Sequence, residues 1–250
     1  ATGNTVRGNL IHGNELGGVV ISDGSENTFG GPAQVERNYL FDNGQAPGDS
    51  QIRANVILCE ADENLVQNNT IGLDENDQPS EYNESNGLIL INSANNRIGG
   101  NSRLTGNRIV VQDLDGIRLE GAQTTGNILF NNFIGTDPVF NDLGNQGDGI
   151  VLLNGASNNQ IGGVVQGPIP GASGRLGTVS PNTIFYNGEA GVSVLGGSST
   201  GNAILQNSFK DNGGEGIELF LGGNNDQVPP EVSFVGPSAI TGTVPDLEAI

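Results

Sequence analysis

Several residue types are rare or missing in this 250-residue chain. It contains one cysteine, so no internal disulfide can form, and we expect Cys59 to be a buried apolar residue because it lies in the apolar run 56–59. His12 is the only histidine, which excludes multi-histidine zinc sites and histidine-based catalytic triads. No apolar stretch is long enough to predict a membrane span.

Basic residues are also scarce. The chain has 9 Lys and Arg against 28 Asp and Glu, which gives a formal net charge of −19. Nucleic-acid binding requires a basic face, and anionic membranes attract basic segments, so the charge argues against both partners. A high negative charge keeps an elongated protein soluble and suits saline or Ca²⁺-rich surroundings.

Helical periodicity is absent, and short apolar runs flanked by Gly and Asn recur instead, which indicates strands and turns. Segments 18–31 and 87–100 align without a gap, as do segments 116–130 and 191–205, which represent a second version of the repeat. The repeats begin at Gly18, Asn55, Gly87, Gly116, Gly149, Gly191 and Gly216. Extra length between them falls in polar stretches that we predict to be inserted loops, at 42–53, 73–86, 136–147 and 164–181.

This repeat predicts an all-β fold, a right-handed parallel β-helix of about seven coils with three short strands per coil. Stacking like strands of successive coils about 4.8 Å apart pairs their backbones, and the Ile and Leu of each Gly-Ile-x-Leu run then form inward columns. Asn at the corners is expected to stack as a hydrogen-bonded ladder rather than to bind sugar. The ladder residues are Asn27, Asn96, Asn127, Asn159 and Asn202.

Four segments carry a family resemblance: Gly155–Gly163, Asn132–Asp137, Asn69–Asp74 and Gly147–Ile150. They resemble the Asn-x-Ile-Gly-Gly, Ile-Gly-Thr-Asp and Asp-Gly-Ile repeats of bacterial extracellular parallel β-helix proteins, over about residues 3–225. The resemblance implies the fold and an extracellular or cell-surface location. It does not imply one activity, because lyases, hydrolases, epimerases, adhesins and structural proteins share this fold.

The domain prediction follows from where the repeats stop. We expect residues 1–226 to form the β-helix and residues 227–250 to form a C-terminal extension, either strands that cap the last coil or the start of an appended domain. The chain starts inside a repeat-like pattern, which is expected of a piece of a larger parent chain.

Register places two carboxylates, Asp115 and Asp148, on neighbouring coils about 5 Å apart. That separation suits the catalytic pair of a retaining glycosidase. It also suits a Ca²⁺ site that Asp113 would complete, and Asp-Gly is also ordinary turn chemistry. Arg118 lies beside the pair, where it is either the helper of a polysaccharide lyase or a salt-bridge partner.

Inserted loops offer the second set of candidates. Asp74 and Asp77 follow an Ile-Gly-x-Asp turn, and they either bind Ca²⁺ or belong to a solvated acidic loop; their spacing does not match an EF-hand. Four aromatic residues in or near loops are either carbohydrate contacts or packing residues: Tyr39, Tyr82, Phe140 and Tyr186.

The sequence therefore predicts an extracellular or cell-surface module that binds a polysaccharide or cell-surface glycan and serves adhesion or matrix assembly, by self-assembly or within a larger chain. The alternative is a polysaccharide lyase or glycoside hydrolase that acts through Asp115 and Asp148. No cofactor is indicated other than Ca²⁺.

Overall fold

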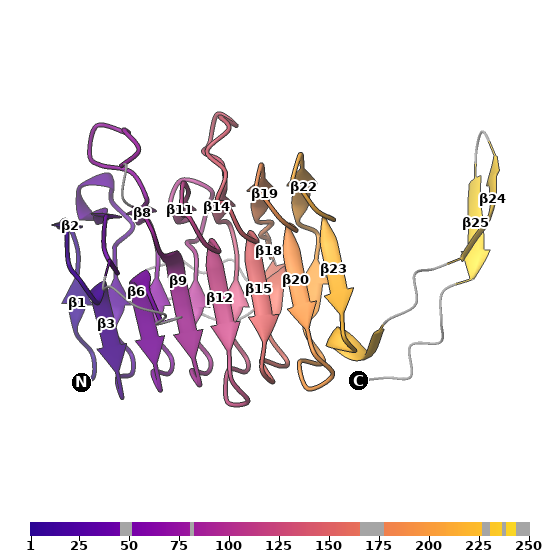
Figure 1. Cartoon of the computed structure of the whole chain (residues 1–250), viewed down its shortest axis with the longest axis horizontal. Helices are drawn as coiled ribbons and strands as arrows, with labels where there is room; N and C mark the ends of the chain where they lie inside the picture. The colour runs from indigo at the N-terminus through magenta and orange to yellow at the C-terminus, as the bar shows by residue number, and fades with distance from the viewer. Residues whose placement is uncertain (46–51, 81–82, 166–177, 227–230, 237–238, 244–250) are drawn as a thin grey trace.

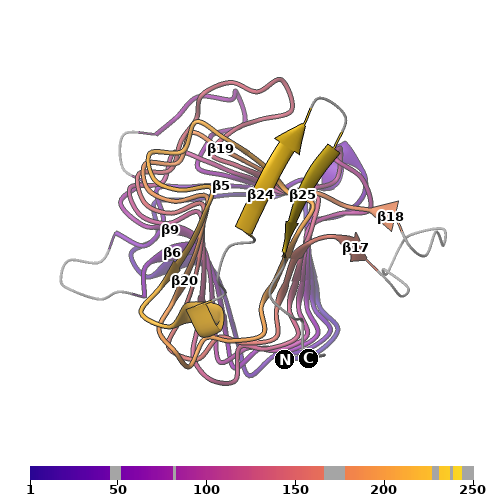
Figure 2. The same ribbon diagram turned by 90° about the vertical axis from the view of Figure 1, so that its right-hand side faces the viewer.

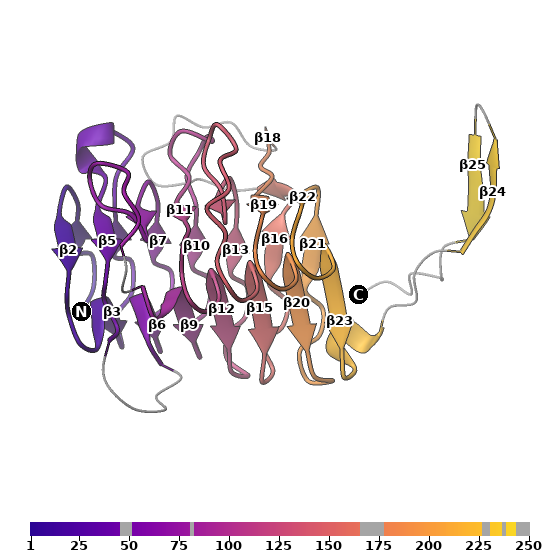
Figure 3. The same cartoon turned by 45° about the horizontal axis from the view of Figure 1, so that its top comes forward.

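The computed structural model describes residues 1–45, 52–80, 83–165, 178–226, 231–236 and 239–243. Three sheets of seven parallel strands wind around one axis, which confirms the predicted right-handed parallel β-helix of about seven coils (Figures 1 and 2). Each coil contributes one strand to each sheet, so residues one coil apart in sequence lie side by side on the same face (Figure 3).

The seven strands of each sheet come from successive coils in chain order. The first sheet contains β3 (Gly17–Ser22), β6 (Ala54–Cys59), β9 (Asn86–Ile91), β12 (Ile117–Glu120), β15 (Ile150–Leu153), β20 (Val192–Leu195) and β23 (Ile217–Phe220). The second contains β1 (Thr5–Val6), β4 (Thr28–Phe29), β7 (Leu65–Val66), β10 (Arg97–Ile98), β13 (Ile128–Leu129), β16 (Gln160–Gly162) and β21 (Ala203–Leu205). The third contains β2 (Leu10–His12), β5 (Tyr39–Phe41), β8 (Thr70–Ile71), β11 (Arg108–Ile109), β14 (Phe133–Ile134), β19 (Thr183–Phe185) and β22 (Ser208–Lys210).

The remaining elements lie outside these sheets. Strands β17 (Val164–Val165) and β18 (Thr178–Val179) pair antiparallel, and the described residues include the 3₁₀ turns η1 (Gln34–Glu36) and η2 (Gly223–Asp226). Strands β24 (Glu231–Gly236) and β25 (Ala239–Thr243) pair with each other, also antiparallel. The role predicted for residues 227–250, a cap or an appended domain, stays a prediction.

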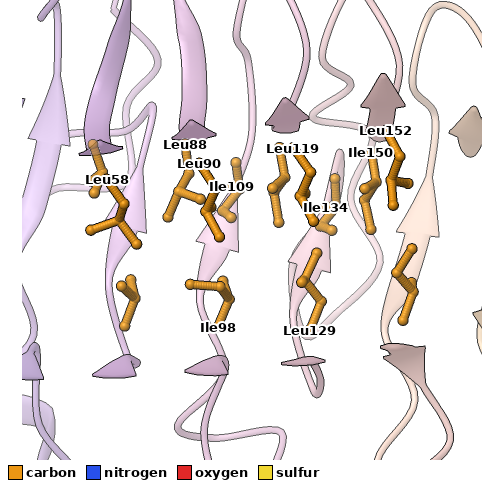
Figure 4. Close-up of a cluster of buried hydrophobic side chains, with 14 of the residues drawn as sticks. Leu58, Leu88, Leu90, Ile98, Ile109, Leu119, Leu129, Ile134, Ile150 and Leu152 are labelled. Carbon is orange, nitrogen blue, oxygen red and sulfur yellow. The ribbon is translucent and has the colours of Figure 1, made fainter. Parts of the chain in front are cut away.

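The core is a set of stacked aliphatic columns. Inward side chains of the first sheet, such as Leu90, Leu119 and Leu152, stack in register and are fully buried (Figure 4). Side chains of the other two sheets, such as Leu129 and Ile134, close the interior from the opposite sides (Figure 4). Because each short strand contributes at most two side chains to this central core, stability depends on coil-to-coil stacking. Cys59 departs from expectation, since it is only partly buried.

Asparagine ladders join the coils at the corners, as predicted. At the corner before the second sheet, the amide of Asn96 donates to Oδ1 of Asn127 at 3.0 Å, and Asn127 donates to Asn159 at 2.9 Å. The backbone N–H groups of the same residues donate to the same oxygens. The whole ladder is Asn4, Asn27, Asn64, Asn96, Asn127, Asn159, Asn202 and Asn224. A second ladder precedes the third sheet, from Asn9 to Asn207.

The irregular repeat at Asn55 has a structural explanation. Asn55 occupies the position that is glycine in the other repeats, and its buried side chain accepts from Asn43 and donates to Gln112, both at 2.9 Å. Asn43 and Gln112 belong to a third asparagine ladder, at the corner before the first sheet. In the coil that Asn55 begins, the chain leaves the third sheet at Leu73 to form an inserted loop, so the described part of this coil supplies no ladder residue of its own at that corner. Asn55 therefore fills a gap in the third asparagine ladder.

The corner glycine before the first sheet is required by packing. A Cβ at Gly116 would lie 2.6 Å from the carbonyl oxygen of Gly149 and 2.8 Å from Cγ2 of the buried Ile134. Gly116 thus faces inward, as does the next residue, Ile117, and the strand's usual alternation is broken at this point. The break turns the preceding residue, Asp115, to the outer face of the sheet beside Arg118.

Candidate functional site

The predicted carboxylate pair lies on the outer face of the first sheet. Asp115 and Asp148 occupy the same corner position on successive coils, and Oδ1 of Asp115 accepts the backbone N–H of Asp148 at 3.0 Å. Oδ1 of Asp148 in turn accepts the N–H of Ala190 at 2.9 Å, and Asn86 accepts the N–H of Asp115 at 3.1 Å. At this corner, the side-chain oxygen of each residue therefore accepts the backbone N–H of the equivalent residue on the next coil, from Asn86 through Asp115 and Asp148.

Burial raises the pKa of both carboxyl groups above the ordinary value of an aspartate. Asp148 is 7% exposed, and desolvation raises its pKa from 3.8 to about 6, opposed by a hydrogen bond from Ser193 and reinforced by the nearby Asp115. Burial also raises the pKa of Asp115, while the N–H of Asp148 and the charge of Arg118 act in the opposite direction. A carboxyl that titrates near neutrality beside a second carboxyl is a pattern found in acid–base catalysis.

Neighbouring side chains extend the cluster in both directions. The hydroxyl of Ser193 lies 2.8 Å from Oδ1 of Asp148 and 3.3 Å from Oε2 of Glu218. Arg118 lies 3.7 Å from Asp115 and donates from Nε to Glu120 at 3.0 Å. Both partners of Arg118 are carboxylates, so the geometry fits a charge partner better than a base.

The residues predicted to bind Ca²⁺ mostly have other partners. The exposed Asp113 accepts a hydrogen bond from Gln146 at 3.0 Å, and Asp77 forms an ion pair with Arg108. Within the described ranges, no group of three or more His, Cys, Asp or Glu side chains has the arrangement of a metal site.

The inserted loops at 73–86 and 136–147 both begin with an Ile-Gly-x-Asp turn, and they share a hydrogen-bonding pattern that explains this common motif. Oδ1 of Asp74 accepts the N–H groups two and four residues later, both at 2.8 Å, and these bonds lower the pKa of Asp74. Oδ1 of Asp137 does the same in the other loop, at 3.0 Å in both cases. The aspartate of each Ile-Gly-x-Asp turn therefore holds its own loop in place.

A second cluster of side chains lies on the outer face of the third sheet, around the neighbouring strands β14, β19 and β22, whose positions Figure 1 shows. It draws on four successive coils, roughly 14 Å along the axis at about 4.8 Å per coil. We call it the aromatic–cation patch, and it consists of Arg103, Phe133, Phe140, Phe185, Tyr186 and Lys210.

Two buried rings support the exposed part of this patch. The guanidinium carbon of Arg103 lies 5.0 Å from the ring centre of the buried Phe133 and 5.5 Å from that of Phe140, which is 47% exposed. The buried Phe185 contacts Phe140, with ring centres 5.7 Å apart, and meets Tyr186 edge to face. The patch thus presents the Phe140 ring, part of the Tyr186 ring and two cations to solvent from a packed base.

The sequence identified only part of this patch. It named Phe140 and Tyr186, and the structure brings them together; Tyr39 lies farther along the same sheet on β5, and Tyr82 lies outside the described residues. Arg103 was missed, because it lies in a polar loop with no repeat counterpart and reaches Phe140 only through the fold.

Fold and site define the class as a right-handed parallel β-helix protein with a carboxylate cluster on one face and an aromatic–cation patch on another. In the described part of the chain, no helix has the length and apolar character needed to cross a membrane. Comparisons with protein-family models, curated proteins and solved structures found no match.

Proposed function

We propose that this chain is an extracellular or cell-surface β-helix module that binds polysaccharide and serves adhesion or matrix assembly. The aromatic–cation patch carries the proposal. The exposed ring of Phe140 and the half-buried ring of Tyr186 offer flat apolar surface for sugar rings, and on a rigid base they lose little side-chain entropy on binding. The rigidity comes from Phe133 and Phe185 beneath the surface and from the paired strands that hold them.

Binding measurements with a panel of neutral and acidic polysaccharides test this proposal. We expect the wild type to bind at least one polymer and Phe140→Ala or Tyr186→Ala to weaken that binding about tenfold, because each removes a stacking ring. Tyr39→Ala is the matched control, since it removes an aromatic ring from the same sheet outside the patch. A wild type that binds no member of the panel, or a control that loses as much affinity as the patch variants, contradicts the proposal.

The carboxylate cluster supports a second candidate, a glycoside hydrolase or polysaccharide lyase. Its specific support is the difference in environment between Asp148, whose pKa is raised to about 6, and Asp115, which lies near Arg118. In a retaining hydrolase, Asp148 would protonate the leaving oxygen while Asp115 attacks. In a lyase, a cluster this acidic would need Ca²⁺ to offset the uronate charge.

Turnover assays on neutral glycans and uronate polymers, with and without Ca²⁺, test the enzyme candidate. We expect any activity of the wild type to be lost in Asp148→Asn and kept in Asp113→Asn. New reducing ends without unsaturated products indicate hydrolysis, and unsaturated products indicate elimination. No turnover of any polymer by the wild type removes this candidate.

A further inference from the structure

Arg103 differs from the other cation of the aromatic–cation patch. Lys210 forms an ion pair with Asp211 at 3.3 Å. Arg103 forms no ion pair with a carboxylate in the part of the chain that the structure describes. It is exposed on the surface, so its charge is available to a ligand.

The guanidinium of Arg103 is held in place before any ligand binds. It lies over two rings, Phe133 and Phe140, and its Nη2 donates to Oγ1 of Thr183 at 3.2 Å. An arginine has five N–H donors in a planar fork, so the bond to Thr183 leaves most of them unused. A fixed fork loses less entropy on pairing with an oxyanion than a free arginine on a surface.

Neither aspartate of the adjacent loop, Asp137 or Asp142, forms an ion pair with this fork. Oδ1 of Asp137 accepts the backbone N–H groups of Val139 and Asn141, and Oδ2 accepts the side-chain amide of Asn141 at 2.7 Å. Both of its oxygens are therefore engaged inside the loop that carries Phe140. The positive charge of Arg103 is left for a group from outside the chain.

The net charge of the protein limits the kind of ligand that can carry this group. At a net charge of −19 the protein repels a polyanion over the length of its surface. A single oxyanion on an otherwise neutral chain avoids most of this repulsion and still pairs with the fork at short range.

We propose that the patch binds a glycan that carries isolated oxyanions, either carboxylates or sulfate esters, on a mainly neutral chain. Arg103 pairs with the oxyanion, while Phe140 and Tyr186 stack on neighbouring neutral sugars. This inference rests on the proposed glycan-binding function and adds the chemical class of the ligand.

A set of matched ligands tests the role of the oxyanion separately from the proposed glycan binding. The probes are a neutral oligosaccharide with one uronic acid, its methyl ester, the same backbone with one sulfate ester, and the unmodified backbone. We expect the wild type to bind the carboxylate or the sulfate form about tenfold or more tightly than its uncharged counterpart. In Arg103→Gln this preference falls to about one while the methyl ester binds as before, and Arg103→Lys keeps only part of it because lysine lacks the fork.

Arg7→Gln is the matched control. Arg7 is an exposed arginine that forms an ion pair with Glu36 on coils outside the aromatic–cation patch, so this variant should keep the full preference for the charged ligands. Equal binding of charged and uncharged forms by the wild type overturns the inference but leaves the proposed glycan binding intact. Loss of the methyl ester together with the acid in Arg103→Gln also overturns it, because Arg103 would then act by packing. A wild type that binds none of the four probes, nor any polymer of the wider panel, overturns the proposed function itself.

Discussion

Replacing Asp148 by asparagine is expected to stabilise this protein at neutral pH. The Asp148 carboxyl is buried, and desolvation raises its pKa to about 6 from an ordinary 3.8. The folded state therefore binds the proton more tightly than the unfolded state. As a result the free energy of unfolding is highest below about pH 4, falls as the pH rises through the window from about 4 to about 6, and stays low above it.

The expected size of the effect follows from the pKa difference. A pKa of about 6 in the folded state against 3.8 in the unfolded chain corresponds, at about 1.4 kcal/mol per pKa unit, to an upper limit of about 3 kcal/mol at pH 7.5. Asparagine removes the charge and keeps an oxygen that accepts from Ala190 and Ser193, as Asp148 does now. Asn86 already occupies this position one coil before Asp115, where its oxygen accepts the N–H of Asp115 and its amide donates to a backbone carbonyl. The corner thus accommodates asparagine without strain.

Urea denaturation at pH 7.5 and at pH 4 measures the effect. We expect Asp148→Asn to raise the free energy of unfolding by about 1–3 kcal/mol at pH 7.5 and by much less at pH 4. Asp113→Asn is the control, because Asp113 is exposed in the same segment and should change stability by less than about 0.5 kcal/mol at either pH. A variant as stable as the wild type at pH 7.5, or a gain of equal size at both pH values, refutes the reasoning.

Three further substitutions test the packing of the coils, each by its urea midpoint. Gly116→Ala should destabilise the protein by about 1–3 kcal/mol, because the new methyl group would collide with the carbonyl of Gly149; an unchanged midpoint would show that the corner relaxes freely. Asn127→Ala should cost about 2–4 kcal/mol, since it leaves buried ladder amides unpaired, and a loss below about 0.5 kcal/mol argues against the ladder as a source of stability. Asn55→Gly restores the residue found in the other repeats, yet it should destabilise by about 2 kcal/mol because Gln112 loses its buried partner. A stabilising effect of that last change would contradict the role assigned to Asn55.

The sequence predicted the fold through its repeats. Gly87, Gly116 and Gly149 begin segments of similar pattern, and the structure places them at the same corner of successive coils. In a β-helix each coil pairs only with its neighbours, so residues that match in the sequence repeat also match in space. The adjacency of Asp115 and Asp148 followed from this registry, and a hydrogen bond joins the two residues in the structure.

Other features depend on contacts that no repeat contains. Simple alternation places Gly116 outward, whereas it faces the buried Ile134 of another sheet, and this break in alternation places Asp115 on the outer face of the first sheet. Asn55 broke the repeat pattern, but the reason, a gap in the asparagine ladder between Asn43 and Gln112, lies in the packing of that corner.

The amino-acid sequence by itself determined the registry of the coils, because stacking repeats a local pattern and needs no long-range information. The tertiary structure alone decided which side chains gather on each face. Arg103 and Phe140 belong to two different loops, and Lys210 to a later coil, so only the winding of the chain brings their neighbourhoods together. Burial likewise raises the pKa of Asp148 from 3.8 to about 6, since desolvation depends on all the groups that the fold packs around the carboxyl.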